Sequence, residues 1–166
     1  MAKGQAERLV PLLEEMLVEA GVGWRELCAI GVGTGPGNFT GVRISVALAR
    51  GLALGLGVPA IGVTALEAMA LGADLPVTVL IDARRDEVYE QSFADGGNSP
   101  AQVVAASGVP STVIGHGGAD PQYPLAEAIA RIAAERWKSP QPRPAPFYLR
   151  GADAAPPSDP PPVILP

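Results

Sequence analysis

The chain has 166 residues and a net charge of −5, so it is long enough for one domain, or two small lobes, with a buried core. No run of four or more basic residues is present, and composition therefore gives no sign that the chain alone binds a nucleic-acid backbone. The single cysteine, Cys28, excludes an internal disulfide and a cysteine-rich zinc site.

The first ten residues, "MAKGQAERLV", lack the apolar centre of a secretory signal. The longest uncharged stretch, residues 51–66, is short and broken by Pro59, so we expect no membrane span. The expected lack of a signal and of a membrane span, together with the single cysteine, predicts a cytoplasmic protein.

The first predicted helix covers residues 7–20 and ends at Gly21. We expect Pro11 in or near its first turn, because deeper in a helix proline removes a hydrogen bond. The apolar side of this helix is formed by Leu9, Leu13, Met16, Leu17 and Ala20.

A buried strand is predicted at residues 28–32, and it is followed by the glycine-rich run "GTGPGNFTGVR" at 33–43. Thr40 is the expected N-cap of the next helix, residues 41–56. The run fails the dinucleotide-loop pattern in all three glycine registers, and it lacks the lysine of a Walker A loop. Two interpretations remain: a tight structural turn built from Gly35, Pro36 and Gly37, or an atypical anion-binding nest.

Small residues recur every four positions along the helix at 41–56, at Ala47, Gly51 and Gly55. Such spacing lets another helix backbone approach closely. Arg43 and Arg50, seven residues apart, lie on one face near this groove. The helix is interpreted either as an ordinary core helix or as a surface that docks a partner together with the first helix.

The next elements are a strand at 60–63 and a helix at 64–71, where Thr64 and Glu67 match a capping box. Alternation of strand and helix up to this point predicts an α/β fold.

Beyond residue 76 the pattern changes to an antiparallel hairpin, with strands at 77–83 and 87–93, and then a strand at 111–117. An amphipathic helix follows at 124–137. We therefore expect a first lobe at residues 1–72, a second lobe at 73–138, and an extended proline-rich tail at 139–166 whose segment 146–150 docks on the body.

Candidate catalytic groups are few. His116 is the only histidine, so a two-histidine metal motif is impossible within one chain and no metal site is predicted. Asp82 and Glu87 flank Arg84 and Arg85, and cross-strand ion pairs are favoured over a catalytic carboxylate pair. The sequence predicts no catalytic residue.

The segments "GTGPGNFTGVRISVALARGLALGLGVPAIGVTALEAMA", "DARRDEVYEQSF" and "PFYLRGADA" resemble, in the same order, the landmarks of the TsaB (YeaZ) family. The resemblance implies the actin-like ATPase and sugar-kinase fold, with two lobes and mixed sheets. It also implies that the chain begins at the first helix, without the usual β-rich segment of roughly thirty residues. The N-terminal lobe would then be incomplete and its sheet edges exposed, so we expect marginal stability.

The resemblance further implies a non-catalytic subunit of the bacterial machinery that makes threonylcarbamoyladenosine in tRNA next to the anticodon. Its partners would be the catalytic subunit TsaD and the ATPase TsaE, with homodimers when it is alone and tRNA contacted only through the complex. No cofactor of its own is implied, and a nucleotide (ATP or ADP) at the complex interface stays open. A phosphotransferase-like, nucleotide-binding enzyme of the same superfamily is the competing hypothesis.

Carried onto this chain, the family's docking face falls on two helices. Its residues are Leu9, Leu13, Met16 and Leu17 on the first, and Arg43, Ala47, Arg50, Gly51 and Leu54 on the second.

Overall fold

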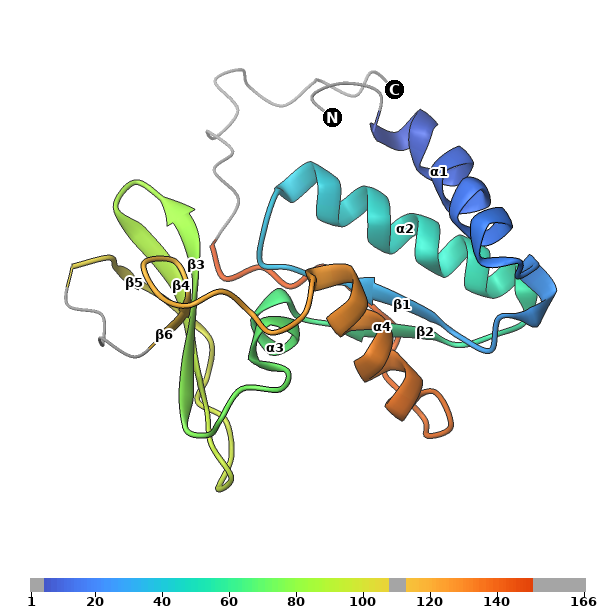
Figure 1. Ribbon diagram of the computed structural model, residues 1–166. Coiled ribbons are helices and arrows are strands. Elements are labelled where there is room, and N and C mark those ends of the chain that lie inside the picture. The colour runs from blue at the N-terminus through green and yellow to red at the C-terminus, as the bar shows by residue number, and fades with distance from the viewer. Residues whose placement is uncertain (1–4, 108–112, 151–166) are drawn as a thin grey trace, which may run out of the picture.

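The computed structural model describes residues 5–107 and 113–150, and Figure 1 shows their arrangement. The helices are α1 (Gln5–Ala20), α2 (Phe39–Leu56), α3 (Ala65–Ala70) and α4 (Leu125–Arg136), with a short 3-10 turn at Trp24–Glu26. The strands are β1 (Ile30–Gly33), β2 (Ala60–Val63), β3 (Val77–Arg84), β4 (Glu87–Phe93), β5 (Gln102–Ala105) and β6 (Val113–Gly115). They form a two-stranded parallel sheet, β1–β2, and a four-stranded mixed sheet in the order β5-β4-β3-β6.

The two-stranded sheet is the middle layer of the first lobe, with α2 on one face and α4 on the other (Figure 1). Val32 points toward α2 and packs with Val46 and Ala49. On the opposite face, Ile61 and Val63 pack against α4. Both faces of the sheet are therefore covered by a helix, as expected for parallel strands.

Close contact between β1 and α4 depends on glycines. A Cβ at Gly31 would lie 3.0 Å from the Cβ of Ala133, and one at Gly33 would lie 3.1 Å from Cδ1 of Ile129. These distances are shorter than ordinary van der Waals contact, so α4 can approach the strand only where the side chain is a hydrogen.

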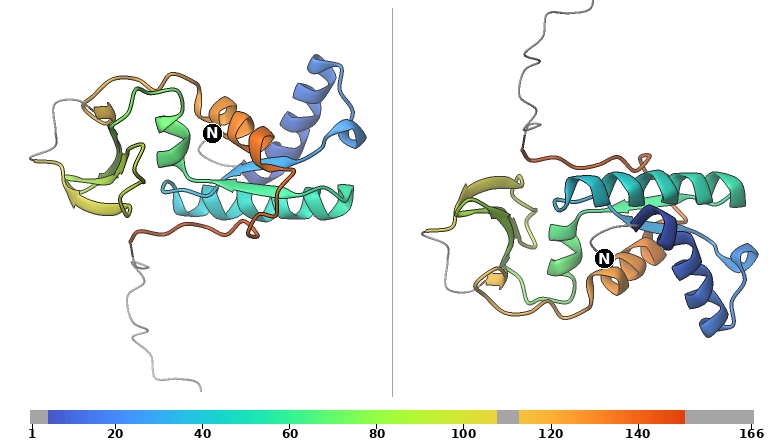
Figure 2. Two further views of the ribbon diagram at one scale, coloured as in Figure 1. Left: turned by 90° about the horizontal axis from the view of Figure 1, so that it is seen from below. Right: turned by 90° about the horizontal axis from the view of Figure 1, so that it is seen from above.

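The second lobe is the four-stranded sheet, and α3 lies between it and the first lobe (Figures 1 and 2). Leu66 of α3 packs with Val77, Val79 and Phe93 of the hairpin. Ala68 of the same helix belongs to the core formed by β2 and α4. Six residues of helix thus join the two cores.

The C-terminal described segment, residues 139–150, has no regular secondary structure and crosses from the first lobe to the second. The backbone N–H of Phe147 donates to the carbonyl of Thr34 at 2.8 Å. Two residues later, Leu149 packs into the cluster around Leu66 and Phe93. This confirms that "PFYLR" docks on the body, and we call residues 144–150 the strap.

Several expectations from the sequence need correction. The first strand begins at Ile30, two residues later than predicted. Pro11 is the seventh residue of α1 rather than a first-turn residue, because the helix already includes Gln5 and Ala6. Helix α4, assigned to the second lobe by its place in the chain, packs on β1, β2 and α3.

Half of the predicted capping box is present at α3. The Thr64 hydroxyl accepts a hydrogen bond from the backbone N–H of Glu67 at 3.1 Å. The Glu67 carboxylate instead forms an ion pair with Arg136 of α4. The Arg136 guanidinium donates a hydrogen bond to this carboxylate, which raises the pKa of Arg136. Strand β5 was not predicted, and Ser111 and Thr112 of the predicted strand at 111–117 lie outside the described residues. The sixteen residues after Arg150 lie outside them too.

Replacing Gly31 by valine is expected to lower the free energy of unfolding by about 1–3 kcal/mol, because the new side chain overlaps α4. The matched control is Gly51→Ala in α2, where no atom lies within 4 Å of the added Cβ. Helix propensity alone predicts that this control gains about 0.5–1 kcal/mol. Urea unfolding measures both, and a Gly31 variant as stable as the parent would contradict the close packing.

Candidate functional site

The glycine-rich run leaves β1 through a turn whose backbone is bound to other parts of the protein. Thr34 donates from its N–H and from its hydroxyl to the carbonyl of Val63, at 2.8 and 3.2 Å. The carbonyl of Gly35 accepts from the N–H of Ala65 at 2.7 Å. This part of the run is therefore fastened to β2, α3 and the strap.

Gly35 occupies a conformation that favours glycine, with φ +103°. A Cβ at this position would lie 3.1 Å from the carbonyl oxygen of Phe147 in the strap. Pro36 follows and is buried, whereas Gly37 is exposed. The geometry of Gly35 and Pro36 favours a structural turn over an anion-binding nest.

Helix α2 begins at Phe39, two residues earlier than predicted. Asn38, not Thr40, is the N-cap: its side-chain oxygen accepts from the N–H of Gly41 at 2.8 Å. Thr40 lies inside the first turn and is exposed. Both residue types cap helices well, and Asn38 takes the role because the chain leaves the Pro36 turn at that point.

The predicted docking residues of α2 lie on its outer side. The inner side carries the buried residues Val46, Ala49 and Ala53. Leu54 is 86% exposed, and no atom lies within 4 Å of a Cβ built at Gly51 or Gly55. We call the exposed residues Ala47, Gly51, Leu54 and Gly55 the α2 stripe. Arg50 is half-buried beside it.

Helix α1 has no buried residue among those whose side chains are described. Leu9, Leu13 and Leu17 are half-buried, and Met16 is 56% exposed. In Figure 2 α1 stands away from the rest of the first lobe. The predicted docking residues on both helices are therefore accessible in the described chain, and their role as an interface stays a prediction.

Helix α2 is also long and apolar enough to cross a membrane by length and composition, with a mean hydropathy of 1.4 and 17% of it buried. It is the single helix of this kind in residues 5–107 and 113–150. Core helices of globular proteins meet the same criterion, and α2 packs on β1 and β2 through one side.

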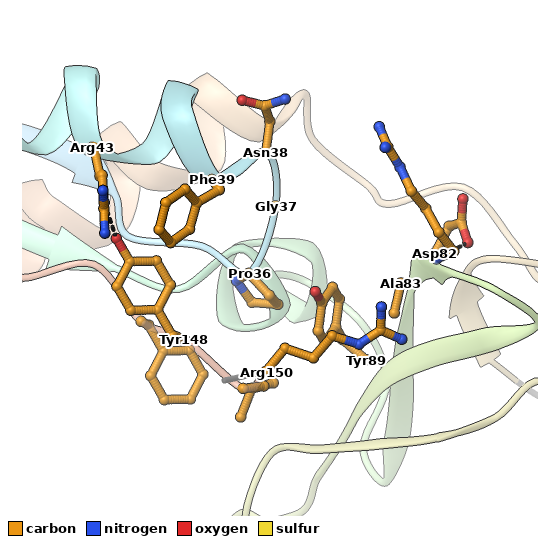
Figure 3. Close-up of a pocket in the computed structure, with 13 residues that line it drawn as sticks. Pro36, Gly37, Asn38, Phe39, Arg43, Asp82, Ala83, Tyr89, Tyr148 and Arg150 are labelled. Atoms are coloured by element: carbon orange, nitrogen blue, oxygen red, sulfur yellow. Dashed lines mark hydrogen bonds between the residues drawn. The ribbon is translucent and has the colours of Figure 1, made fainter. Parts of the chain in front are cut away.

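A cavity of about 890 Å³ opens between the lobes, where α2 begins (Figure 3). Three segments line it: residues 36–43 at the start of α2, residues 82–89 of the β3–β4 hairpin, and residues 147–150 of the strap. Figure 3 shows Arg43 and Tyr148 meeting on one side, with Arg150 extended toward Tyr89 on the other.

The charged hairpin residues have local partners. Asp82 accepts a hydrogen bond from the N–H of Arg84 at 2.8 Å, and Glu87 forms an ion pair with Arg150. This agrees with the structural interpretation of Asp82 and Glu87, although the partner of Glu87 comes from the strap rather than from the hairpin. His116 lies in the turn after β6, because the strand ends at Gly115 rather than at residue 117 as predicted. Within the described ranges no three potential metal ligands gather in one place.

The sequence did not single out Phe39, Tyr89, Tyr148 or Arg150 as site residues. Tyr148 and Arg150 lie in the "PFYLR" segment that was expected to dock, so a signal for them existed. No sequence motif pointed to Phe39 or Tyr89. The glycine-rich run and the hairpin that contain them were predicted from turn residues and apolar spacing, which say nothing about a cavity.

Comparison with known proteins identifies the relatives of this chain. Residues 1–153 match the family described as TsaD, tRNA N6-adenosine threonylcarbamoyltransferase. An uncharacterised protein of Mycobacterium leprae is 35% identical over 93% of this chain, and the chain spans 47% of that relative's length. The tRNA threonylcarbamoyladenosine biosynthesis protein TsaB of Escherichia coli is 43% identical over 50% of this chain and 38% of its own length.

Solved structures of similar fold point to the same family as the sequence relatives. YeaZ from Pseudomonas aeruginosa superimposes with a TM-score of 0.64 at 30% identity, covering 81% of this chain and 78% of that one. A Pseudomonas aeruginosa protein described as similar to the peptidase YeaZ gives a TM-score of 0.65 at 27% identity, covering 87% and 84%.

Loss of the Asn38 side chain is expected to destabilise the start of α2. Asn38→Ala should lower the free energy of unfolding by about 1 kcal/mol, because one helix N–H loses its acceptor. Thr40→Ala, two residues away, is the control and should cost nothing measurable. Thermal or urea unfolding compares the two, and equal losses would show that the cap is assigned to the wrong residue.

Proposed function

The chain belongs to the TsaB/YeaZ type within the TsaD family of tRNA threonylcarbamoyladenosine proteins, and on that premise we propose that it is a non-catalytic docking subunit in this tRNA modification. Its fold is the actin-like ATPase and sugar-kinase fold that the family resemblance implied. The α2 stripe is the single observation that carries the proposal.

The shape of the α2 stripe suits contact with a helix of a partner protein. Glycine in the middle of a helix costs stability relative to alanine, so two helical glycines with open space around them bring no benefit within this chain. An absent side chain does allow a second backbone to come close. The exposed Leu54 beside them offers apolar area for the same contact.

A protein partner suits α2 better than a lipid surface does. The inner side of the helix is packed on a sheet, so it cannot be surrounded by lipid. Arg43 and Arg50 both lie within the helix, and charged groups are costly at the depth of acyl chains. A partner helix would cover the apolar stripe and leave the Arg50 guanidinium at its polar rim, while Arg43 stays bonded to Tyr148.

The partner we propose is TsaD, with TsaE joining the pair and tRNA contacted only through the complex. Helix α1 supplies Leu9, Leu13, Met16 and Leu17 to the same docking face, and the free chain pairs with itself through it. The subunit works in the cytoplasm and has no cofactor of its own, and ATP or ADP binds at the interface with TsaD.

The competing phosphotransferase hypothesis has no support from the glycine-rich run, whose turn is occupied by hydrogen bonds to Val63, Ala65 and Phe147.

Filling the stripe tests the docking proposal. Gly51→Trp places a large side chain in open space, so the variant is expected to fold while its affinity for TsaD of the same organism falls at least about tenfold. Calorimetric titration of the two purified proteins measures the dissociation constants.

The matched control is Leu125→Asp at the start of α4, an exposed leucine outside the proposed face, 47% exposed. It is compared with Leu54→Asp in the stripe. We expect the affinity to fall for Leu54→Asp and to stay unchanged for Leu125→Asp. Unchanged binding by folded Gly51→Trp and Leu54→Asp would refute the proposed face.

A further inference from the structure

We propose that residues 163–165 of the same chain cover the α2 stripe in the free protein and compete there with a partner protein or a second copy. The proposal rests on the docking function proposed above, because it names what occupies the same face before a partner binds. Residues 151–166 lie outside the described part of the chain, and the argument uses their sequence, their length and the place where they begin.

The α2 stripe is an apolar surface with free space above it. Leu54 is 86% exposed, and no atom lies within 4 Å of a Cβ built at Gly51 or Gly55. The missing side chains at these two positions leave a shallow groove beside Leu54, which can accept branched apolar side chains. Covering such a surface removes apolar area from water and is therefore favourable.

Residues 163–165 have the chemistry that this groove requires. They read "VIL", and the preceding residues 151–162 contain no valine, leucine, isoleucine, methionine or aromatic residue. Prolines stand at 160–162 before this apolar run and at 166 after it. Because proline fixes its own φ, the run has less conformational freedom to lose when it docks.

The segment begins at a point that is held beside the start of α2. Arg43 Nε donates to the Tyr148 hydroxyl at 2.8 Å, as the dashed line in Figure 3 marks. The Phe39 and Tyr148 rings lie 5.1 Å apart between their centres. Arg150, the last described residue, forms an ion pair with Glu87. Residue 151 therefore follows directly from a strap that is fixed near the first turn of the helix.

The length of the segment is sufficient to reach the stripe. From Arg43 to Leu54 the helix rises about 17 Å. Residues 151–162 span about 37 Å in a polyproline-like conformation, at about 3.1 Å per residue. Attachment through such a linker gives an effective concentration in the millimolar range. A contact of only three apolar residues benefits from this, whereas a second copy at micromolar concentration does not.

The charges on the two sides are complementary. Helix α2 contains Arg43 and Arg50 and no acidic residue, and Arg50 is half-buried beside the stripe. Residues 151–166 contain Asp153 and Asp159 and no basic residue. Attraction between opposite charges therefore favours an approach of this segment to α2.

Disulfide trapping in the full chain tests whether residues 163–165 lie on the stripe. Cys28 is exposed and is first replaced by serine, and Leu54→Cys is then combined with Ile164→Cys. Dilute protein is oxidised with glutathione disulfide, and a non-reducing gel separates chains closed by an internal disulfide from open chains and covalent dimers. We expect most chains to close internally.

The matched control combines Leu125→Cys with Ile164→Cys in the same background. Leu125 is 47% exposed and lies on α4, which covers the opposite face of the β1–β2 sheet from α2. We expect little internal closure in this pair. Equal closure in the two pairs, covalent dimers alone, or no internal closure of the Leu54→Cys pair would each overturn the proposal. Covalent dimers alone would assign the stripe to a second copy.

The competition is tested by calorimetric titration with TsaD of the same organism. Ile164→Gln should bind TsaD at least about threefold more tightly than the parent, because the stripe is then free in a larger fraction of the molecules. Ala155→Gln introduces the same side chain outside the apolar run and should leave the affinity unchanged.

The two experiments separate this proposal from the docking function. Internal closure without a gain in TsaD affinity for Ile164→Gln would overturn the competition. If TsaD binds neither the parent nor the variants, the docking function fails, and the trapping experiment still decides whether residues 163–165 cover the stripe.

Discussion

Two-sided burial of a very short sheet is the constraint on which the rest of this structure depends. Strands β1 and β2 have four residues each, and such a pair is stable only when helices cover both faces. Helix α4 reaches β1 through Gly31 and Gly33, and α2 covers the other face through Val46 and Ala49. Once α2 is fixed in this way, its opposite side must face outward, which is where the stripe lies.

The strap makes the two lobes one molecule. It crosses the turn at Thr34 and Gly35, where Phe147 donates to a carbonyl, and then inserts Leu149 among the side chains of the second lobe. Glycine at position 35 is required because a side chain there would meet the strap's backbone. The glycine-rich run therefore lets the backbone of the strap lie close to it at Gly35. This close contact places Tyr148 and Arg150 at the cavity.

The sequence predicted the elements whose pattern is local. Strand β2, the β3–β4 hairpin and helix α4 were all recognised, because each has a clear apolar period between turn residues. Strand β5 was missed because "QVVA" is short, and among the described residues it pairs with β4 alone. The order of elements along the chain did not show that α4 packs on β1 and β2, because α4 follows the β3–β4 hairpin in sequence but lies in the first lobe.

The cavity could not be predicted for a similar reason. Its lining comes from residues 36–43, 82–89 and 147–150, and no periodicity links segments that far apart. Arg43 illustrates the limit. Helical spacing placed it beside Arg50 on the docking face, whereas Tyr148, 105 residues away in the sequence, binds its Nε at the cavity.

Helix α2 consequently carries two different surfaces along its length. Its first turns present Phe39 and Arg43 to the cavity, and the stripe begins one turn later at Ala47. The two surfaces share a rigid backbone but no side chain, so a substitution in one leaves the contacts of the other intact. The proposed docking through Gly51 and Leu54 therefore uses a part of the helix that does not line the cavity.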